Sequence, residues 1–407
     1  MTAPRLDAAG AENLRLSLTA LLAAELGAAT ELRHELHRTP ELSGAEHATA
    51  AAVARALGCP DAPAIAETGR LIRIGPADGP CIAVRAELDG LPVPEQTGAC
   101  MASVNGAMHA CGHDVHLAAL SALGRAARQA DLPVALLAVL QPREEAAPSG
   151  ALDIATSAAF AAQHPAAMVG AHLQHLLPAG TVAAPAGVIN AATDDFEITV
   201  SGRGGHAGYP QLAADPVLAL CQSVVTLQQL ISRRIDPTHA AVISVGTLQA
   251  GHAPNVIPAT AKARGTIRTL DQHDRQFLRS AIGEAVAAVC RAHGCDGTVT
   301  VVPAEPALVN DSRLAAACQP LLRRAGYVVE TGFYSCGADD FAYYAAQSQG
   351  AASQGAGLPS VMLFAGSGTA VALHHPEFLP PDSAIGDVAA AMLAGYLAAL
   401  ALMPPQL

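Results

Sequence analysis

Tryptophan is absent from this chain of 407 residues, and the aromatic share is only 3%. Hydrophobic residues nevertheless make up 51% of the chain, with alanine the most abundant, which favours helices that pack closely through small side chains. Charged residues are also scarce, at 14%, which argues against a disordered chain and leaves enough apolar surface for a large core. At about 150 residues per domain, this length predicts two or three domains.

Basic residues are fewer than acidic ones, with 23 lysines and arginines against 35 aspartates and glutamates, and the net charge is -12. A nucleic-acid surface needs clustered lysine and arginine to contact phosphates. The composition therefore argues against a nucleic-acid partner and is typical of a soluble protein.

The nine cysteines are odd in number and scattered, mostly in apolar surroundings, so they favour a reducing compartment over a disulfide framework. The segment Met1–Arg5 lacks a basic region followed by an apolar core, so no secretion signal is expected. The apolar stretch Val388–Met403 is expected to be too short for a membrane span and to form a buried helix. Together these features predict a cytoplasmic protein with no membrane contact.

One short stretch, Met108–His116, combines three imidazoles, one thiol and one carboxyl group. Cys111 and His113 are two residues apart, so on an extended or turning backbone they point the same way, and Gly112 lets the chain bend between them. A thiolate and an imidazole that converge suit zinc or a neighbouring first-row ion. The alternative is a polar start to a helix that continues through the apolar run Leu117–Leu120.

Strands and helices alternate through the first half of the chain, which predicts an α/β fold with a mostly parallel sheet covered on both faces. The expected strands are 71–74, 81–86, 134–140 and 168–171, and the expected helix is 117–129.

Residues that carry reactive groups follow three of these strands: Asp89 after 81–86, Glu144 and Glu145 after 134–140, and His172 after 168–171. Open α/β sheets place their sites at these carboxyl ends. On a regular strand the two adjacent glutamates cannot point at one spot, but one can bind metal while the other contacts a water. Alternatively, Asp89 caps a turn at Gly90 and the glutamates form a solvated acidic turn.

The pattern changes after Gly187. Residues 196–200 alternate with period two, as expected for a half-exposed antiparallel strand, and a glycine-rich turn that contains His206 follows. We expect an inserted α+β domain at 188–303, while 1–187 and 304–407 form the α/β domain. The inserted domain is expected to contain further helices at 216–232 and 274–292 and further strands at 241–249, 261–270 and 298–302.

Two more features concern helix ends. Residues 11–58 look helical, and Ser43 with Glu46 three residues later predicts a capping box for a helix that runs to Leu57. The segment Gly337–Tyr344 is expected to start a helix with an acidic first turn.

Nine segments, in this order, resemble the zinc-peptidase-like M20 family, and specifically its amidohydrolase branch of hippurate hydrolases, N-acyl-amino-acid deacylases and auxin-conjugate hydrolases. They are HRTPELSGAE from His37, RAELDGLPVPEQTG from Arg85, MHACGHDVH from Met108, QPREE from Gln141, GRGGHAGYP from Gly202, HAPNVIP from His252, GTIRTL from Gly265, GADDFAYY from Gly337 and LHHPEF from Leu373. The resemblance covers nearly the whole chain. It implies a catalytic α/β domain made of two chain segments, with a lid or dimerisation domain inserted between them.

The resemblance also implies residue roles. The ligands of a two-metal centre match Cys111, His113, Glu145, His172 and His374. The general base matches Glu144, and Asp89 matches the aspartate that steadies the metal site from behind. On the lid, His206 would help to stabilise the oxyanion, often across a dimer, while Asn255 and Arg268 would hold the substrate's carboxylate or backbone.

Some positions depart from the branch. Glu87 stands where an aspartate is common, Arg143 replaces a small residue, and Ala146–Ser149 replaces a glycine-rich run, which leaves the substrate preference open. Either His374 or His375 could be the ligand, and the family's spacing to Pro376 favours His374.

The expected function is hydrolysis of N-acetyl, N-benzoyl or aryl-acetyl amino acids to a carboxylic acid and a free amino acid. The implied cofactors are two divalent ions (zinc, manganese, or cobalt and nickel), which polarise the amide and lower the pKa of a water to about 7. Glu144 would move the proton, and a homodimer through the inserted domain is expected.

Three alternatives remain at this point. A dipeptidase or carboxypeptidase could use the same centre, an aromatic-amine deaminase is a more distant possibility, and a non-catalytic metal-binding dimeric protein could keep the fold. Loss of Glu144 or of a ligand would indicate the last, and the sequence retains all of them.

Overall fold

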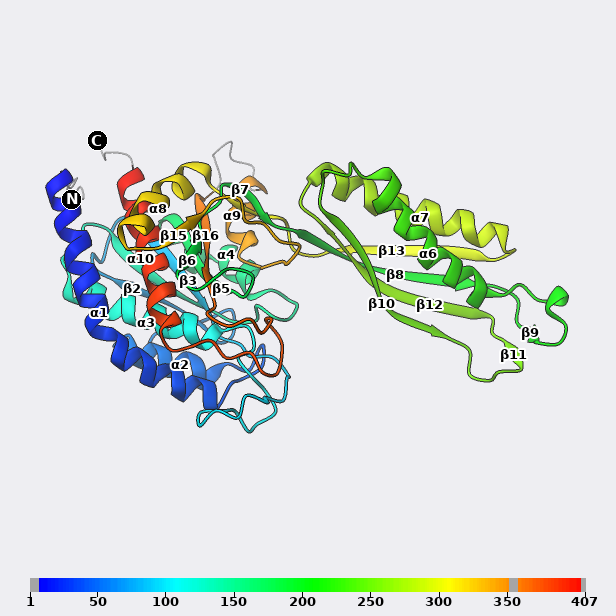
Figure 1. Cartoon of the computed structure of the whole chain (residues 1–407), viewed down its shortest axis with the longest axis horizontal. Coiled ribbons are helices and arrows are strands. Elements are labelled where there is room, and N and C mark those ends of the chain that lie inside the picture. The colour runs from blue at the N-terminus through cyan, green and yellow to red at the C-terminus, as the bar shows by residue number, and fades with distance from the viewer. Residues whose placement is uncertain (1–6, 351–357, 404–407) are drawn as a thin grey trace. The chain divides into compact units, whose positions relative to one another are not determined.

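The computed structural model describes residues 7–350 and 358–403, so the N-terminal segment on which the expectation about a secretion signal rests lies outside it. The chain forms two compact units (Figure 1). Unit 1 comprises Met1–Gly187, Val309–Phe333 and Asp340–Leu407, and unit 2 comprises Val188–Leu308 and Tyr334–Asp339.

Unit 1 is built on an eight-stranded sheet with the order β1-β2-β4-β3-β5-β16-β6-β15. The four central strands β4, β3, β5 and β16 run parallel to their neighbours within this group, which confirms the predicted α/β fold with a mostly parallel sheet. All residues of β3, β4 and β16 are buried, as in sheets covered on both faces. The strands are β1 (Ala64–Ile65), β2 (Gly69–Ile74), β3 (Cys81–Glu87), β4 (Ala135–Gln141), β5 (Pro165–Gln174), β6 (Thr181–Ala183), β15 (Val328–Glu330) and β16 (Ser360–Gly366).

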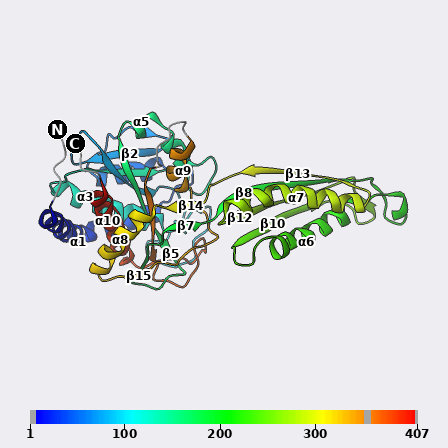
Figure 2. The ribbon, with the colours of Figure 1, turned by 90° about the horizontal axis from the view of Figure 1, so that it is seen from above.

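Helices cover both faces of this sheet. A Cβ on Gly395 would lie 2.4 Å from Val169, whereas a Cβ on the next strand residue, Gly170, would lie 2.9 Å from Phe341. Because consecutive strand residues face opposite sides, α10 and Phe341, the residue before α9, cover opposite faces of β5. Figure 2 shows α1, α3 and α10 together on one side. The helices are α1 (Ala8–Arg38), α2 (His47–Ala56), α3 (His113–Gln129), α4 (Gly150–Ala155), α5 (Ala158–Ala161), α8 (Ser312–Arg324), α9 (Ala342–Gly350) and α10 (Ala384–Leu402).

The helical region predicted at 11–58 is interrupted. Helix α1 ends at Arg38 and α2 begins at His47. Pro40 disfavours helical backbone at the residue before it, which explains the end of α1. The predicted capping box is wrong: Glu46 is the N-cap residue of α2 but its side chain makes no capping hydrogen bond, and Ser43 bonds elsewhere.

Helix α10 has the length and composition of a membrane span, so the expectation that this stretch is too short was wrong. Most of the helix is nevertheless buried inside unit 1, and the Tyr396 hydroxyl donates to the carbonyl of Val134 at 2.6 Å. The expected buried alanine- and leucine-rich helix is therefore present, and it packs in the hydrophobic core of unit 1.

Unit 2 contains an antiparallel four-stranded sheet with the order β10-β12-β8-β13. Helices α6 and α7 pack on it over an apolar core that includes Phe196, Ile198 and Leu278. Its elements are β8 (Ala192–Ser201), β9 (Gly205–His206), the 3₁₀ turn η1 (Pro210–Leu212), α6 (Pro216–Arg234), β10 (Ala241–Ala250), β11 (Val256–Ile257), β12 (Thr260–Thr269), α7 (Gln272–Ala292) and β13 (Asp296–Pro303). Strands β7 (Gly187–Asn190) and β14 (Leu308–Asn310) pair where the chain passes between the units.

Candidate metal centre

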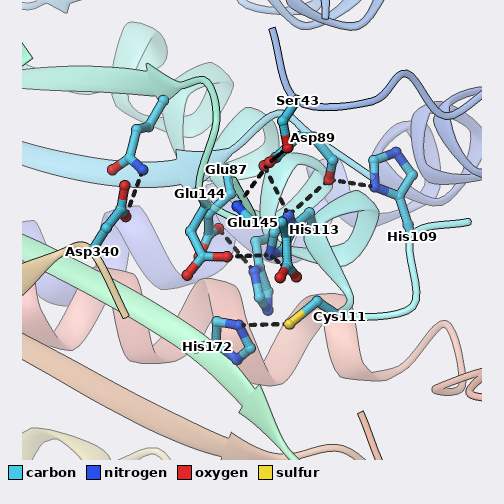
Figure 3. A network of polar contacts seen from close by, with 12 residues as sticks. Ser43, Glu87, Asp89, His109, Cys111, His113, Glu144, Glu145, His172 and Asp340 are labelled. Atoms are coloured by element: carbon cyan, nitrogen blue, oxygen red, sulfur yellow. Dashed lines mark hydrogen bonds and ion pairs between the residues drawn. The ribbon is translucent and has the colours of Figure 1, made fainter. Parts of the chain in front are cut away.

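Four of the five predicted metal ligands gather at the carboxyl ends of β3, β4 and β5, beside the start of α3 (Figure 3): Cys111, His113, Glu145 and His172. Ligand atoms of Cys111, His113 and Glu145 all lie within 4.8 Å of one another. This is the edge at which open α/β sheets place their sites.

Gly112 brings Cys111 and His113 to one place. It has a φ of +91° and precedes the first residue of α3, and a Cβ there would lie 2.9 Å from the side chain of Leu173. Glycine is therefore the residue that this turn accommodates without strain. The spacing predicted the convergence, and the turn supplies it.

His113 is oriented by a hydrogen bond behind it. Its Nδ1–H donates to the backbone carbonyl oxygen of Asp89 at 2.8 Å. Its Nε2 is buried and has no hydrogen-bond partner among the described residues. Such a nitrogen, fixed in its tautomer from the other side, is typical of a metal-binding histidine.

Both glutamates after β4 approach His113. Nε2 of His113 lies 3.8 Å from Oε2 of Glu144 and 3.9 Å from Oε1 of Glu145. The expectation that adjacent carboxylates cannot face one spot applies to a regular strand, but β4 has already ended at Gln141. Arg143 has a left-handed φ of +50°, and the resulting turn lets both side chains face the cluster.

The remaining predicted ligands lie next to these residues. His172 donates its Nδ1–H to the carbonyl of Leu173 at 2.6 Å, and its Nε2 lies 3.4 Å from the sulfur of Cys111. Nε2 of His374 lies 3.2 Å from Oε1 of Glu145. The adjacent His375 instead accepts the backbone N–H of Glu377 at its Nδ1.

Asp89 contacts two parts of the cluster from the protein side. Its Oδ2 accepts the Ser43 hydroxyl at 2.7 Å and the Glu145 backbone N–H at 2.9 Å, and its Oδ1 lies 3.4 Å from Nδ1 of His113. Burial would raise the pKa of the Asp89 carboxyl, but these partners lower it, so the group is a carboxylate.

The electrostatics of the cluster fit a divalent cation. Burial raises the pKa of the Cys111 thiol, and the charges of Glu145 and Glu144 raise it further. Burial lowers the pKa of His113, yet Glu87 and Asp89 raise it to about 10. A cation would take the place of the protons that the carboxylates hold on the sulfur and the imidazole. Thiolate, imidazole and carboxylate are ligands that zinc and its neighbours accept.

Sequence reasoning assigned no role to Glu87 and His116, which lie beside two of the predicted ligands. Ligand atoms of Glu87, His113, His116 and His172 also lie within 4.8 Å of one another. His116 donates its Nδ1–H to Glu87 at 2.9 Å, however, and accepts the Leu173 N–H at its Nε2 at 3.0 Å. With both nitrogens used, His116 supports β5 beside His172 and does not bind metal. Its position three residues after His113, on the same helix face, could have indicated this role.

Asp340 links Glu87, through Arg85, to the loop that follows the two glutamates. Its Oδ1 accepts from Arg85 at 2.9 Å, and Arg85 also bonds Glu87. Its Oδ2 accepts the hydroxyl of Ser149, the N-cap residue of α4, at 2.7 Å. The predicted role of this aspartate in an acidic first helical turn is wrong, because α9 begins only at Ala342.

The three predicted lid residues all belong to unit 2. His206 on β9 pairs with Val256 on β11, and the carbonyl of Asn255 accepts the N–H of Ala207 at 3.0 Å, so His206 and Asn255 are neighbours. Arg268 lies near the far end of β12, where its Nη1 donates to the carbonyl of Cys336 at 3.0 Å. The roles of these three residues at the metal centre remain predictions.

Known proteins resemble this chain over most of its length. Peptidase family M20/M25/M40 matches residues 83–400. N-acetylcysteine deacetylase from Bacillus subtilis is 34% identical over 363 residues, which cover 87% of this chain and 92% of that protein. N-acetyldiaminopimelate deacetylase from the same organism is 33% identical over 380 residues, with coverage of 91% and 98%.

A solved structure of a dinuclear metal-binding peptidase of the M20 family, also from Bacillus subtilis, superposes with a TM-score of 0.77 at 30% identity, and the match covers 93% of this chain and 99% of that chain. These matches confirm the resemblance inferred from the nine segments and identify a metal-dependent enzyme that hydrolyses amide bonds. The chain belongs to peptidase family M20/M25/M40.

Proposed function

We propose that this M20 amidohydrolase cleaves the amide bond of N-acyl amino acids and releases a carboxylic acid and a free amino acid. The observation that carries the proposal is the convergence of Cys111, His113 and Glu145, with the Glu144 carboxylate 3.8 Å from the same imidazole nitrogen. The names of two relatives, both deacetylases of N-acetylated amino acids, support it.

Five residues would hold two divalent ions: Cys111, His113, Glu145, His172 and His374. When bound, the ions polarise the amide carbonyl and lower the pKa of a water to about 7. Thiolate and imidazole ligands favour zinc, the carboxylate also admits manganese, and cobalt or nickel can substitute. The dinuclear relative supports the number of ions.

Glu144 is the proton carrier in this proposal. Its carboxylate accepts a proton from the attacking water and returns it to the leaving nitrogen, a contribution of about 10²- to 10⁴-fold in rate. Glu145, one residue further on, lies 3.2 Å from His374 and would serve as a ligand. In this proposal Glu144 transfers the proton and Glu145 binds the metal.

Two phenylalanines lie near His172: Phe364 is buried, and only Phe333 is open enough to contact an acyl group. Phe364 pairs with His172 across β16 and β5, with ring centroids 6.5 Å apart. Phe333 packs on Phe364 at 5.3 Å and is only partly buried. We propose that Phe333, with Phe364 behind it, favours benzoyl and aryl-acetyl groups in addition to acetyl.

We also infer a homodimer, because one chain cannot place all three predicted lid residues on one substrate. Thr260, at the start of β12, pairs with Ser201 near β9, whereas Arg268 pairs with Thr193 at the opposite end of β8. Eight residues at about 3.3 Å each separate these ends, far more than the length of an N-acyl amino acid. His206 and Asn255 would therefore come from the second subunit, in a two-fold arrangement.

Mixed subunits test this arrangement. His206→Ala and Glu144→Gln subunits should each have low activity alone, and mixing them should restore activity, because one site then receives Glu144 and His206 from different chains. If native mass spectrometry detects the mixed dimer and activity stays low, the sharing of His206 between subunits is wrong.

The nine unpaired cysteines support a cytoplasmic location for this dimer.

The main experiment is a matrix of substrates and metals. N-acetyl, N-benzoyl and indoleacetyl amino acids are offered to the enzyme loaded with zinc, manganese, cobalt or nickel, with unblocked dipeptides as the matched control. We expect turnover of the acylated substrates only. Cleavage of dipeptides with a free amine, but not of acylated amino acids, would make the protein a dipeptidase instead.

A further inference from the structure

The turn between α1 and α2 contacts the turn that carries the two glutamates. The side chain of Glu46 is fully buried and accepts three hydrogen bonds. Its Oε1 accepts the backbone N–H of Gly44 at 2.8 Å and that of Arg143 at 2.9 Å, and its Oε2 accepts the hydroxyl of Thr68 at 2.7 Å. A residue that looked like a helix cap thus holds the backbone next to Glu144.

Two buried carboxylates hold the backbone on either side of Glu144. Glu46 accepts the N–H of the residue before it, and Asp89 accepts the N–H of Glu145, the residue after it, at 2.9 Å. The same oxygen of Asp89 also accepts the hydroxyl of Ser43. The turn that contains Ser43 and Glu46 therefore anchors both flanks of the proposed base.

The residue before the base needs such an anchor. Arg143 has a φ of +50°, a left-handed conformation that is strained for a non-glycine residue and persists where the surroundings impose it. Its guanidinium is also fixed, by Glu67 at 2.6 Å and by Asp153. Without the acceptor that Glu46 offers, the buried N–H of Arg143 would lose its partner, and an extended backbone would be preferred.

We infer that Glu46 is a positioning residue for Glu144: it sets the backbone turn that aims the base at its water. This inference rests on the proposed function, which makes Glu144 the base. Displacement of a reacting group by about 1 Å can cost on the order of 100-fold in rate. Loss of the Glu46 carboxylate should therefore lower kcat and leave KM and metal content nearly unchanged.

Glu41 provides a matched control in the same turn. Its carboxylate also accepts three hydrogen bonds, from the N–H of Ala48 at 3.2 Å and from the N–H and hydroxyl of Thr49 at 2.7 and 2.8 Å. None of these partners belongs to the turn at Glu144. Glu41→Ala therefore removes as many hydrogen bonds as Glu46→Ala, but at the start of α2.

The experiment compares kcat, KM, metal content and melting temperature of Glu46→Ala, Glu46→Gln and Glu41→Ala. We expect lower melting temperatures for both alanine variants and a fall in kcat, by about tenfold or more, only for Glu46→Ala. Glu46→Gln keeps an oxygen for both N–H groups and should restore most of the rate. Equal falls in kcat for the two alanine variants would overturn the inference. If Glu46→Ala does not fold, Glu46→Gln is compared with Glu41→Gln. The glutamine at position 46 keeps an oxygen for both N–H groups, so a kcat equal to that of Glu41→Gln supports the anchor, and a large loss of kcat in Glu46→Gln alone overturns it.

A double-mutant cycle separates positioning from a general structural effect. In the Glu144→Gln background, Glu46→Ala should cause little further loss of kcat, because the group that it positions no longer acts as a base. A further loss as large as that in the native background would overturn the inference. If Glu144→Gln itself keeps a normal rate, the proposed function fails; if it is impaired while Glu46→Ala is not, only the inference fails.

Discussion

Replacement of Asp89 by asparagine should weaken metal binding without leaving a cavity, because the two side chains have nearly the same size. The carboxylate has two donors on Oδ2 and lies 3.4 Å from Nδ1 of His113 through Oδ1. An asparagine that keeps its oxygen at the Oδ2 position must turn its NH₂ group towards the Nδ1–H of His113. The reverse orientation turns the NH₂ group towards the N–H of Glu145. In either case two donors face each other and the negative charge is gone.

The size of the effect follows from these contacts. The hydrogen bond from His113 to the backbone carbonyl of residue 89 survives this substitution, so the loss is that of the carboxylate charge and of its contacts around the ligands. Replacement of such a partner of metal-binding side chains typically lowers metal affinity by about 10- to 100-fold. That range corresponds to about 1.4 to 2.7 kcal/mol of binding free energy. A hydrogen bond to a charged group contributes about 1.5 to 3 kcal/mol to folding, so the free energy of unfolding should fall by a similar amount.

Competition with a chromogenic chelator measures the affinity directly, and the matched control is Ser43→Ala. This variant removes one hydrogen bond from Oδ2 but keeps the charge and the contact with the Glu145 N–H. We expect its metal affinity to stay near that of the native protein. Native affinity in a folded Asp89→Asn variant would refute the reasoning, and an equal loss in Ser43→Ala would assign the effect to the hydrogen bond instead of the charge.

Three further predictions concern the base, the substrate carboxylate and pH. Glu144→Gln should retain metal and lose at least about 100-fold in turnover; a near-normal rate in a steady-state assay would make Glu144 a structural residue. Arg268→Ala should raise KM for substrates with a free carboxylate but not for their amides, and equal effects on both would remove Arg268 from the substrate site. Burial would lower the pKa of His37, but Asp114 and Glu95 raise it above the ordinary 6.5. Protonated His37 therefore adds stability that is fully present below pH 6.5 and is lost as the pH rises through the higher folded pKa. His37→Gln should lower the free energy of unfolding at acidic pH, and this difference from the native protein should shrink towards alkaline pH. Denaturant unfolding at a series of pH values measures it.

Local patterns predicted the main elements of the fold. The strands β3, β4 and β5 and the helix α3 were visible because each is an apolar run with a clear period or length. The strands β6 and β15, of three residues each, are too short to show any period. Strand β6 forms because the longer β16 pairs with it, and β15 in turn pairs with β6, so the cause of both strands is not local.

The site was predictable where it depends on spacing and not where it depends on distant contacts. Cys111 and His113 converge through the single residue between them. The approach of both glutamates to His113 depends on the conformation of Arg143, whose N–H is held by Glu46, 97 residues earlier. In sequence, Ser43 and Glu46 match a capping box, and the competing partners that prevent capping become visible only in the fold.

The position of β16 sets an order of events during synthesis. This strand lies between β5 and β6 in the sheet, although the ribosome makes it long after both. The sheet and helices of unit 2 are encoded within 188–308 and can fold while unit 1 still waits for its missing strand. Until then one edge of β5 is unpaired, and an open apolar edge invites aggregation and chaperone binding in the nascent chain. His374, which lies 3.2 Å from Glu145, is the last of the five proposed ligands to be synthesised, so the proposed metal site can be complete only near the end of translation.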